Sequence, residues 1–123
     1  MSGPGNGRLA DWTEGVSAIV YQRCAACRHL WYFRRGFCPR CGSTCVETLA
    51  ASGRGTVHAV TLVSRAPTHE LAAELPYLVI LVDAAEGFRL MAHGEPNLRI
   101  GDPVAAGFAE LAGRLIPYFR LAR

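Results

Sequence analysis

The sequence contains no lysine, and all 13 of its basic residues are arginine. Its formal net charge is only +3, so the chain lacks the dense positive charge that drives non-specific binding to nucleic acids or anionic membranes. Arginine nevertheless holds phosphate and carboxylate groups through a planar fork of donors. Single arginines therefore remain candidates for anion contacts, although the composition indicates no general basic surface.

Long apolar segments are also missing. The longest purely apolar run, YLVILV at Tyr77–Val82, ends at Asp83 and is far shorter than the roughly 20 residues of a membrane-spanning helix. The N-terminal stretch MSGPGNGRLADW has no apolar core of the kind that a secretory signal peptide carries. We therefore expect a cytoplasmic protein with no membrane partner.

The length of 123 residues fits one domain or two very small ones. The hydrophobic fraction of 50% is enough for a folded chain. Met1–Gly7 is a tail of glycine, proline, asparagine and serine, and we expect a short helix over Leu9–Gly15 with Trp12 on one face. Extended chain from Val16 to Gln22 then leads into a cysteine-rich segment.

Four of the five cysteines fall in that segment, YQRCAACRHLWYFRRGFCPRCGS, with the spacing Cys-x2-Cys-x10-Cys-x2-Cys. Each Cys-x-x-Cys turn directs two thiolates to one side of a metal ion, and two such turns complete the tetrahedron that zinc prefers. A reducing compartment favours metal binding over disulfide formation. The spacing therefore predicts one Zn²⁺ held by Cys24, Cys27, Cys38 and Cys41.

A complete shell of four thiolates leaves no open position for water or substrate, so we expect this zinc to be structural. Two alternatives without a metal are four ordinary buried thiols and redox-active Cys-x-x-Cys pairs. Neither explains why two pairs occur at the spacing suited to one ion. Of the two spare candidates, His29 lies too close to Cys27 to complete the shell, and Cys45 is expected in a strand that packs below the metal site.

After the cysteines, the pattern changes to short β-like segments separated by glycine and proline. In one of them Phe88, Leu90 and Ala92 would face one way and the residues between them the other. Five such strands predict a small closed or partly closed barrel. The segment Pro67–Pro76 is either a loop or a single helical turn. The five predicted strands are Thr56–Arg65, Tyr77–Ala84, Phe88–Glu95, Pro103–Leu111 and Arg114–Leu121.

Taken in order, these features resemble the DUF35 family, whose members join an N-terminal rubredoxin-like zinc ribbon to an acyl-CoA-associated OB-fold. The resemblance rests on the four cysteines, the strand opening SGRGT, the hairpin EGFRL, the turn IGDPV and the closing Pro-x-Phe, and it covers roughly Trp12–Leu121. One departure is the loop RHLWYFRRGF, which is not the proline-rich form often seen in the family. The expected organisation is a tail and short helix over 1–21, a zinc ribbon over 22–47 and a five-stranded OB-fold over 48–123.

The resemblance also implies an accessory role. Such proteins are similar to small partners of thiolase-fold enzymes of acyl-CoA metabolism, including thiolases, acyltransferases and retro-aldolases, and the catalytic residues lie on the partner. We therefore expect a non-catalytic subunit of a hetero-oligomer, with acyl-CoA as a candidate ligand. A chain isolated from its partner could instead form a homodimer through the apolar surface left uncovered.

Candidate contacts for ligand and partner lie around the cysteines and at the first barrel strand. The glycines of SGRG precede a β pattern instead of a helix, so they indicate a bend or close strand packing and not a phosphate loop. Aromatic residues and arginine are enriched in the hot spots of protein interfaces. The candidates are Arg34, Arg35 and Arg54 for the phosphates of CoA, and Trp31, Tyr32 and Phe33 for the partner.

Two other classes of function stay open. OB-folds and zinc ribbons also occur in proteins that bind single-stranded nucleic acid, but the barrel has few aromatic residues and no lysine-rich loops, so nucleic acid is the less favoured partner. A stand-alone acyl-CoA hydrolase is the other alternative, although the four histidines fit no known catalytic motif. His58 and His93 fall on predicted strands and could approach each other across the barrel, but we expect both to be structural.

Overall fold

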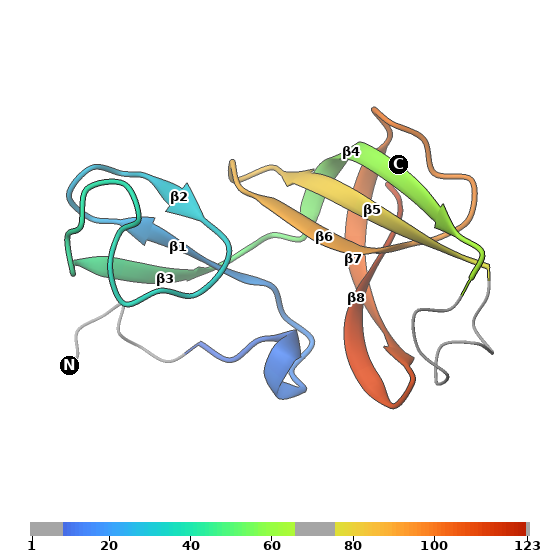
Figure 1. Cartoon of the computed structure of the whole chain (residues 1–123), viewed down its shortest axis with the longest axis horizontal. Helices are drawn as coiled ribbons and strands as arrows, with labels where there is room; N and C mark the ends of the chain where they lie inside the picture. The colour runs from blue at the N-terminus through green and yellow to red at the C-terminus, as the bar shows by residue number, and fades with distance from the viewer. Residues whose placement is uncertain (1–8, 66–75, 123) are drawn as a thin grey trace.

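The computed structural model describes residues 9–65 and 76–122. Its elements are the 3₁₀ helix η2 (Trp12–Glu14) and the strands β1 (Val20–Cys24), β2 (Leu30–Trp31), β3 (Val46–Ala50), β4 (Arg54–Val63), β5 (Tyr77–Ala84), β6 (Arg89–Gly94), β7 (Pro103–Leu111) and β8 (Arg114–Leu121). A three-stranded sheet has the order β2-β1-β3, and a closed barrel has the order β4-β5-β6-β8-β7. Figure 1 shows the two side by side along the long axis. The predicted mainly β fold, with five strands closing a barrel, is confirmed.

The helix predicted over Leu9–Gly15 is reduced to the single 3₁₀ turn η2. Asp11 caps this turn, because its carboxylate accepts the Thr13 amide at 3.0 Å while the Glu14 carboxylate accepts the Asp11 amide at 3.3 Å. This reciprocal arrangement is a capping box. Gly15 adopts a left-handed conformation with φ of 85°, which ends the turn before a longer helix can form.

The ribbon sheet is built on β1, which pairs with both of its neighbours in antiparallel register. Its central residue Gln22 is only 6% exposed, and a buried amide must find hydrogen-bond partners. The Oε1 atom of Gln22 accepts the indole Nε1–H of Trp31 and the backbone amide of Arg35, each at 2.7 Å. One buried polar side chain thereby holds the start of the loop between the two cysteine pairs.

The barrel core follows from alternation along each strand. Val57 pairs with Val82 across β4 and β5, and both are at most 2% exposed. Leu90 and Ala92 on β6 and Phe88 directly before it are all buried, so the three residues share one face as predicted. The predicted bounds of β5, β7 and β8 coincide with the observed ones, whereas β4 begins and ends two residues earlier than Thr56–Arg65.

The glycines of the SGRG stretch serve the bend and the close strand packing that the sequence predicted. Gly53 has φ of 88°, a conformation that side chains other than glycine rarely adopt. A Cβ atom on Gly55 would lie 2.6 Å from the carbonyl oxygen of Asp83 and 2.6 Å from Cγ1 of Val82. Glycine therefore lets β4 approach β5 at the point where the chain enters the barrel.

Aromatic rings connect the ribbon to the barrel. The Phe88 ring stacks on Tyr21 with centroids 4.7 Å apart and on Tyr32 with centroids 5.7 Å apart. The hydroxyl of Tyr32 accepts the indole N–H of Trp12 at 2.7 Å, and burial raises the pKa of this hydroxyl. The stack brings η2, the ribbon and the barrel into contact at one place.

Two further predictions concern the segment between β4 and β5 and the question of membrane-spanning helices. The segment Pro67–Pro76, expected as a loop or helical turn, lies outside them except for Pro76. Within the described residues, no helix is long and apolar enough to cross a membrane.

Candidate functional site

The four cysteines of the two Cys-x-x-Cys pairs form one cluster. Their Sγ atoms all lie within 4.8 Å of one another. The Sγ atoms of Cys24 and Cys41 are 3.6 Å apart, and those of Cys27 and Cys38 are 3.7 Å apart. A tetrahedral zinc site with Zn–S bonds of about 2.3 Å has edges of about 3.8 Å. The cluster therefore has the size of a four-thiolate zinc site, and these distances are too long for disulfides.

Backbone amides support the sulfur atoms from both turns. Cys24 Sγ accepts the amides of Ala26 and Cys27, each at 3.3 Å. Cys38 Sγ accepts those of Arg40 and Cys41 at 3.3 and 3.4 Å. The bond from the Cys27 amide is the largest of the effects that lower the pKa of Cys24 to about 6, because a donated hydrogen bond stabilises a thiolate. The amide bonds of the turns thus favour the thiolate form at Cys24 and at Cys38, the pKa of which is also lowered.

The two turns have the same backbone path. The amide of Arg28 donates to the Cys24 carbonyl at 3.0 Å, and that of Gly42 donates to the Cys38 carbonyl at 2.9 Å. Arg28 and Gly42 are both left-handed, with φ of 71° and 81°. The arrangement is a pair of matched turns, which is what delivers two thiolates from each side of one ion.

The two spare candidates lie outside the cluster. His29 stacks on Trp31, with ring centroids 5.7 Å apart. Cys45 does not pack below the ribbon, as the sequence indicated: it is exposed, and it precedes β3 instead of lying within it. Its amide bonds to the Ser43 hydroxyl at 3.1 Å, so the chain reaches the strand only after Cys45 and leaves its thiol in solvent.

Arg34 is engaged within the chain. Its Nη2 donates to the Leu9 carbonyl at 2.5 Å and lies 3.6 Å from carboxylate oxygens of Asp11 and Glu14. These contacts tie the loop between the cysteine pairs to η2 and offset the guanidinium charge. Arg34 is therefore a poorer phosphate contact than the sequence indicated. The neighbouring Arg35 is exposed, and its guanidinium has no ion pair within the described residues.

The three aromatic candidates for partner contact point in different directions. Trp31 is 9% exposed and belongs to the ribbon core with Cys24 and Cys38. Tyr32 joins the interdomain stack on Phe88. Phe33, at 75% exposed, is the member of the set that a partner can reach. Because the Trp31 indole N–H is bonded to the buried amide of Gln22, Trp31 has little surface to offer a partner, and its role in partner binding stays a prediction.

Arg54 lies at the start of β4, next to the bend. Its amide donates to the Ser52 hydroxyl at 3.2 Å, and the Ser52 amide donates to Glu86 at 2.7 Å. These bonds fix the backbone while the Arg54 side chain stays exposed and has no ion pair within the described part of the chain. Arg54 and Arg35 are thus the two candidates whose guanidinium groups remain available to an anion.

The two strand histidines have different surroundings. His58 lies 3.3 Å from an oxygen of Asp83, whose other oxygen accepts Arg89 Nε at 2.6 Å. The bond from Arg89 lowers the pKa of Asp83. His93 stacks on Tyr77, with centroids 5.0 Å apart, and burial lowers its pKa. In these contacts neither histidine meets the other, which agrees with separate structural roles.

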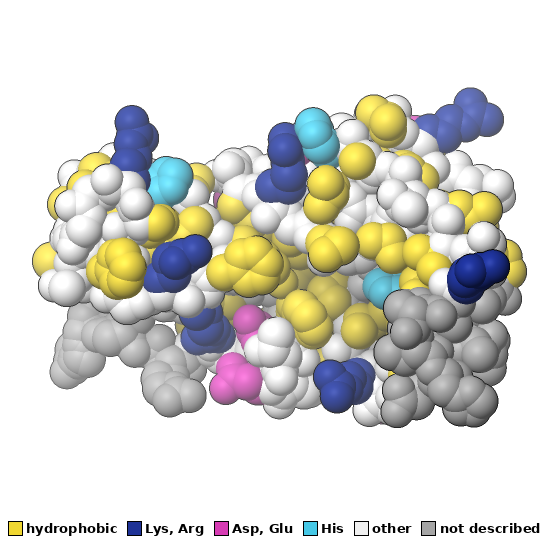
Figure 2. Space-filling model, viewed as in Figure 1, with side chains coloured by type: hydrophobic (Ala, Val, Ile, Leu, Met, Phe, Trp, Pro, Cys, Tyr) yellow, Lys and Arg dark blue, Asp and Glu magenta, His cyan; other side chains and the backbone are white. Residues whose placement is uncertain are grey.

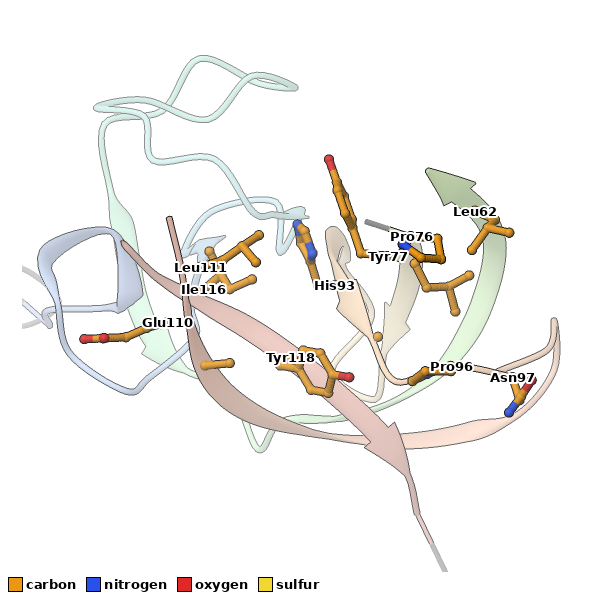
Figure 3. A pocket seen from close by; sticks show the side chains of 13 residues that line it. Leu62, Pro76, Tyr77, His93, Pro96, Asn97, Glu110, Leu111, Ile116 and Tyr118 are labelled. Carbon is orange, nitrogen blue, oxygen red and sulfur yellow. The ribbon is translucent and has the colours of Figure 1, made fainter. Parts of the chain in front are cut away.

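A pocket of about 350 Å³ opens beside His93. Figure 3 shows the rings of His93 and Tyr77 next to each other on one wall, with Tyr118 below them. The charged group in its described lining is the acidic Glu110, so the pocket is not suited to the phosphates of CoA. Its lining residues are Leu62, Pro76, Tyr77, Leu78, His93, Gly94, Pro96, Asn97, Ala109, Glu110, Leu111, Ile116 and Tyr118.

Sequence reasoning missed Gln22 and Phe88 as organisers of the site. Gln22 fixes the loop that carries the candidate arginines, and Phe88 sets the ribbon against the barrel. A signal for Gln22 was present, since an amide in the run IVYQRC lies at a position that the strand pattern buries. The role of Phe88 depends on a contact between residues far apart in the sequence, and no local pattern carries that information.

Two family models match the chain in order. The rubredoxin-like zinc ribbon domain of ChsH2 matches residues 14–47, and the C-terminal OB-fold domain of ChsH2 matches residues 49–109. The chain is 38% identical over 120 residues to a probable enoyl-CoA hydratase alpha subunit of Thermomonospora curvata, of which it spans 37% of the length. It is 29% identical over 98 residues to a DUF35 domain-containing scaffold protein of Methanothermobacter thermautotrophicus, of which it spans 73%.

Solved structures agree with these matches. A chain of an Ltp2-ChsH2(DUF35) aldolase is 35% identical, with a TM-score of 0.73 and coverage of 86% of both chains. A DUF35 protein of unknown function from Sulfolobus solfataricus has the same fold at 18% identity, with a TM-score of 0.57 and coverage of 85% of this chain and 76% of that one. The ordered zinc ribbon and OB-fold, the cysteine cluster and these likenesses show that the chain belongs to the DUF35 family.

Proposed function

We propose that this protein is a non-catalytic accessory subunit of a thiolase-fold enzyme complex that acts on acyl-CoA. The observation that carries the proposal is the likeness to the ChsH2(DUF35) chain of an aldolase, at 35% identity over 86% of both chains. The relative called a DUF35 domain-containing scaffold protein supports an organising role. The T. curvata relative is much longer than this chain and is called a hydratase subunit. The reaction that the partner enzyme catalyses is therefore part of the proposal.

Cys24, Cys27, Cys38 and Cys41 would hold one structural Zn²⁺. The bound ion supplies a crosslink between the two turns, and four thiolates leave it no position for a substrate. The chain's own part is to present the sulfur atoms through the amide bonds of the two turns. Because the ribbon contributes few buried side chains of its own, the metal stabilises the platform from which Arg35 and Phe33 project.

The surroundings of the histidines favour a non-catalytic subunit. Within the described residues, the contacts of His58 and His93 are with Asp83, Arg89 and Tyr77. Nucleophilic catalysis needs a hydroxyl or thiol within hydrogen-bond reach of such a base. A stand-alone acyl-CoA hydrolase is therefore the weaker proposal, and catalysis is assigned to the partner.

Arg35 and Arg54 are the proposed contacts for the phosphates of CoA. Both guanidinium groups are exposed and lack an ion pair within the described residues, whereas Arg34 is paired with Asp11 and Glu14. Arginine can bind a phosphate in a bidentate manner. The acyl group would then continue to the partner's active site along the barrel. Nucleic-acid binding is less favoured, because Trp31 and Tyr32 pack internally and cannot serve as stacking platforms.

An affinity purification of the tagged chain from lysate of its own organism tests this function. The expected result is a thiolase-fold protein recovered in a fixed ratio to the bait and identified by mass spectrometry. Recovery of nucleic acid with its processing proteins, in place of such an enzyme, would contradict the proposal. Release of free CoA from an acyl-CoA by the purified chain alone would contradict the non-catalytic assignment.

A further inference from the structure

The barrel is closed at one seam by a short ladder. Strands β6 and β8 pair there at only two positions, His93 with Tyr118 and Gly94 with Phe119. The ladder between β7 and β8 runs over almost the full length of both strands. The hairpin of β7 and β8 therefore extends past the point where β8 leaves β6, and the pocket of about 350 Å³ beside His93 opens at this seam.

All five barrel strands contribute residues to the lining of this pocket. Leu62 from β4, Leu78 from β5 and Ile116 from β8 are among its apolar members. Figure 2 shows further hydrophobic side chains along the part of the barrel where β5 and β6 lie in Figure 1. A volume of this size with a mainly apolar lining is typical of sites for small molecules. The pocket therefore favours a ligand that gains free energy by leaving water.

One wall of the pocket is formed by flat rings. The rings of Tyr77 and His93 stack with 17° between their planes, and in Figure 3 the side chains of Leu111 and Ile116 lie on the other side of His93 from Tyr77. Burial lowers the pKa of His93, so its imidazole is uncharged at neutral pH. An uncharged imidazole has one donor and one acceptor nitrogen. Within the described residues, the His93 side chain has no hydrogen bond that would occupy them.

The charges at the pocket argue against an ionic ligand. The charged side chain in the described lining is the exposed carboxylate of Glu110. Arg120 does not belong to that lining and lies over the Tyr118 ring, with its Cζ 4.9 Å from the ring centroid. An anionic ligand would therefore meet a like charge with no cation in the lining to pair with. A cationic ligand would meet only an exposed carboxylate, and ion pairs in solvent contribute little.

The pocket is separate from the proposed contacts for CoA. Arg54 begins β4, whereas Leu62 lies near the end of the same strand. Residues of a strand rise about 3.3 Å each, so the two positions lie about 26 Å apart along β4. A molecule in the pocket would therefore leave Arg54 available to a phosphate.

We propose that the pocket at the seam of β6 and β8 binds an uncharged, mainly apolar molecule that contains a flat ring. The ring would lie against the wall of Tyr77 and His93, because stacked or edge-to-face rings attract each other beyond the burial of their area. One polar atom of the ligand would form a hydrogen bond with the imidazole of His93. The inference goes beyond the proposed accessory function and does not depend on it.

Titration of the full chain with 2-naphthalenemethanol tests the site, with the histidine ring signals followed by NMR. This probe has a flat apolar ring, one hydroxyl and no charge. The signals of His93 should shift and reach saturation, because a ring bound beside them changes their local magnetic field. Those of His58 should stay in place, since His58 contacts Asp83 at the opposite end of β5. The charged analogues 2-naphthoate and 2-naphthylmethylamine should each bind more weakly than the alcohol.

Two variants locate the ligand through the fluorescence of the naphthyl group. Ala109→Phe places a ring in the pocket, because Ala109 belongs to the lining and pairs with Ile116, and it should lose most of the binding. Ala105→Phe is the matched control: Ala105 faces the same side of β7 but lies outside the lining. His93→Phe keeps a ring beside Tyr77 and removes both nitrogens, so it should weaken binding several-fold. Thermal unfolding shows whether each variant folds as the parent does.

The outcomes that overturn the proposal are distinct from those that test the proposed function, because no partner enzyme is present. If the His93 signals do not shift, or if His58 shifts with them to the same extent, the alcohol has no specific site at the seam. Unchanged binding by folded Ala109→Phe, or by folded His93→Phe, would also overturn the site. If either charged analogue binds more tightly than the alcohol, the assignment of an uncharged ligand is wrong.

Discussion

The ring of Tyr21 in the ribbon lies flat against the ring of Phe88 in the barrel, with 4.7 Å between centroids and 16° between planes. Tyr32 stacks on Phe88 as well, at 5° between planes. Phe88 is 5% exposed and sits directly before β6. The orientation of the cysteine-bearing ribbon therefore depends on a barrel residue, and the two structures are expected to unfold together.

Replacing Phe88 by alanine should remove this connection. Burial of the ring and its two stacking contacts are lost together, and such changes cost about 3–5 kcal/mol. The free energy of unfolding, measured by urea titration, should fall by that amount. Phe33→Ala is the control: its ring is 75% exposed, so the change should stay within about 0.5 kcal/mol. Equal effects of the two variants would show that the stack does not couple the ribbon to the barrel.

Zinc should follow the four clustered cysteines and not the fifth. The parent should contain one zinc per chain by mass spectrometry of metals, and Cys24→Ser should lose most of it. Structural zinc sites of this kind contribute about 10–16 kcal/mol of apparent binding free energy, so the ribbon should also lose its β signal. Cys45→Ser should keep the metal, because Cys45 lies outside the cluster.

Substitution of cobalt gives an independent reading of the same site. A tetrahedral four-thiolate Co²⁺ site has strong thiolate-to-metal absorption, and the parent and Cys45→Ser should both show it. Loss of the band in Cys45→Ser would move Cys45 into the shell and contradict the assignment.

Gly55 should tolerate no side chain. A Cβ atom there meets the Asp83 carbonyl oxygen at 2.6 Å, and relief of that overlap requires β4 and β5 to separate. Gly55→Ala should destabilise the fold by about 1–3 kcal/mol. At Gly36 an added Cβ meets no atom within 4 Å, so Gly36→Ala serves as the control and should be near neutral. Thermal unfolding of both variants provides the comparison.

The imidazole of His93 should titrate below its ordinary range, because burial disfavours the charged ring. Its folded pKa is then lower than its unfolded pKa of about 6.5. The unfolded chain binds the proton more readily in this window, so stability should fall as the pH drops from about 6.5 towards the folded value. NMR titration of the ring gives the pKa, and His93→Gln should show a weaker loss of stability with falling pH. A folded pKa at or above 6.5 would contradict the account.

Removal of the two free guanidinium groups should weaken CoA binding. Arg35→Ala together with Arg54→Ala should lower the affinity for CoA several-fold by calorimetry, because both groups are available to phosphate. Arg34→Ala should instead lower stability with little effect on CoA, since Arg34 contacts Leu9, Asp11 and Glu14. Unchanged CoA affinity in the double variant would remove both residues from the ligand site.

Local sequence patterns were sufficient to predict the cysteine cluster and the positions of the barrel strands. The cysteine spacing depends only on turns of four residues, and alternation in Phe88–Ala92 reports directly which face is buried. Local patterns did not predict that Trp31 and Tyr32 pack against other side chains inside the protein. Both read as surface aromatics among arginines, yet the buried amide of Gln22 and the ring of Phe88 draw them inside.

Arg34 illustrates the same limit for charge. Its acidic partners Asp11 and Glu14 lie 20 or more residues earlier in the sequence, at the N-cap and the last residue of the turn η2. An unpaired arginine and a paired one look identical in the sequence, because the distinction depends on which distant segment packs beside the loop. Composition therefore identifies arginines as candidate anion contacts. Only the fold shows that Arg34 is paired with carboxylates, whereas Arg35 and Arg54 have no ion pair within the described residues.

The accessory role itself is tested most directly by reconstitution. The thiolase-fold protein recovered with this chain would be purified apart from it, and acyl-CoA turnover would be measured for each protein alone and for the mixture. The account predicts no turnover by this chain, low turnover by the enzyme alone, and full turnover when both are present in a fixed ratio. Turnover by the isolated enzyme that is unchanged on addition of this chain would contradict the account.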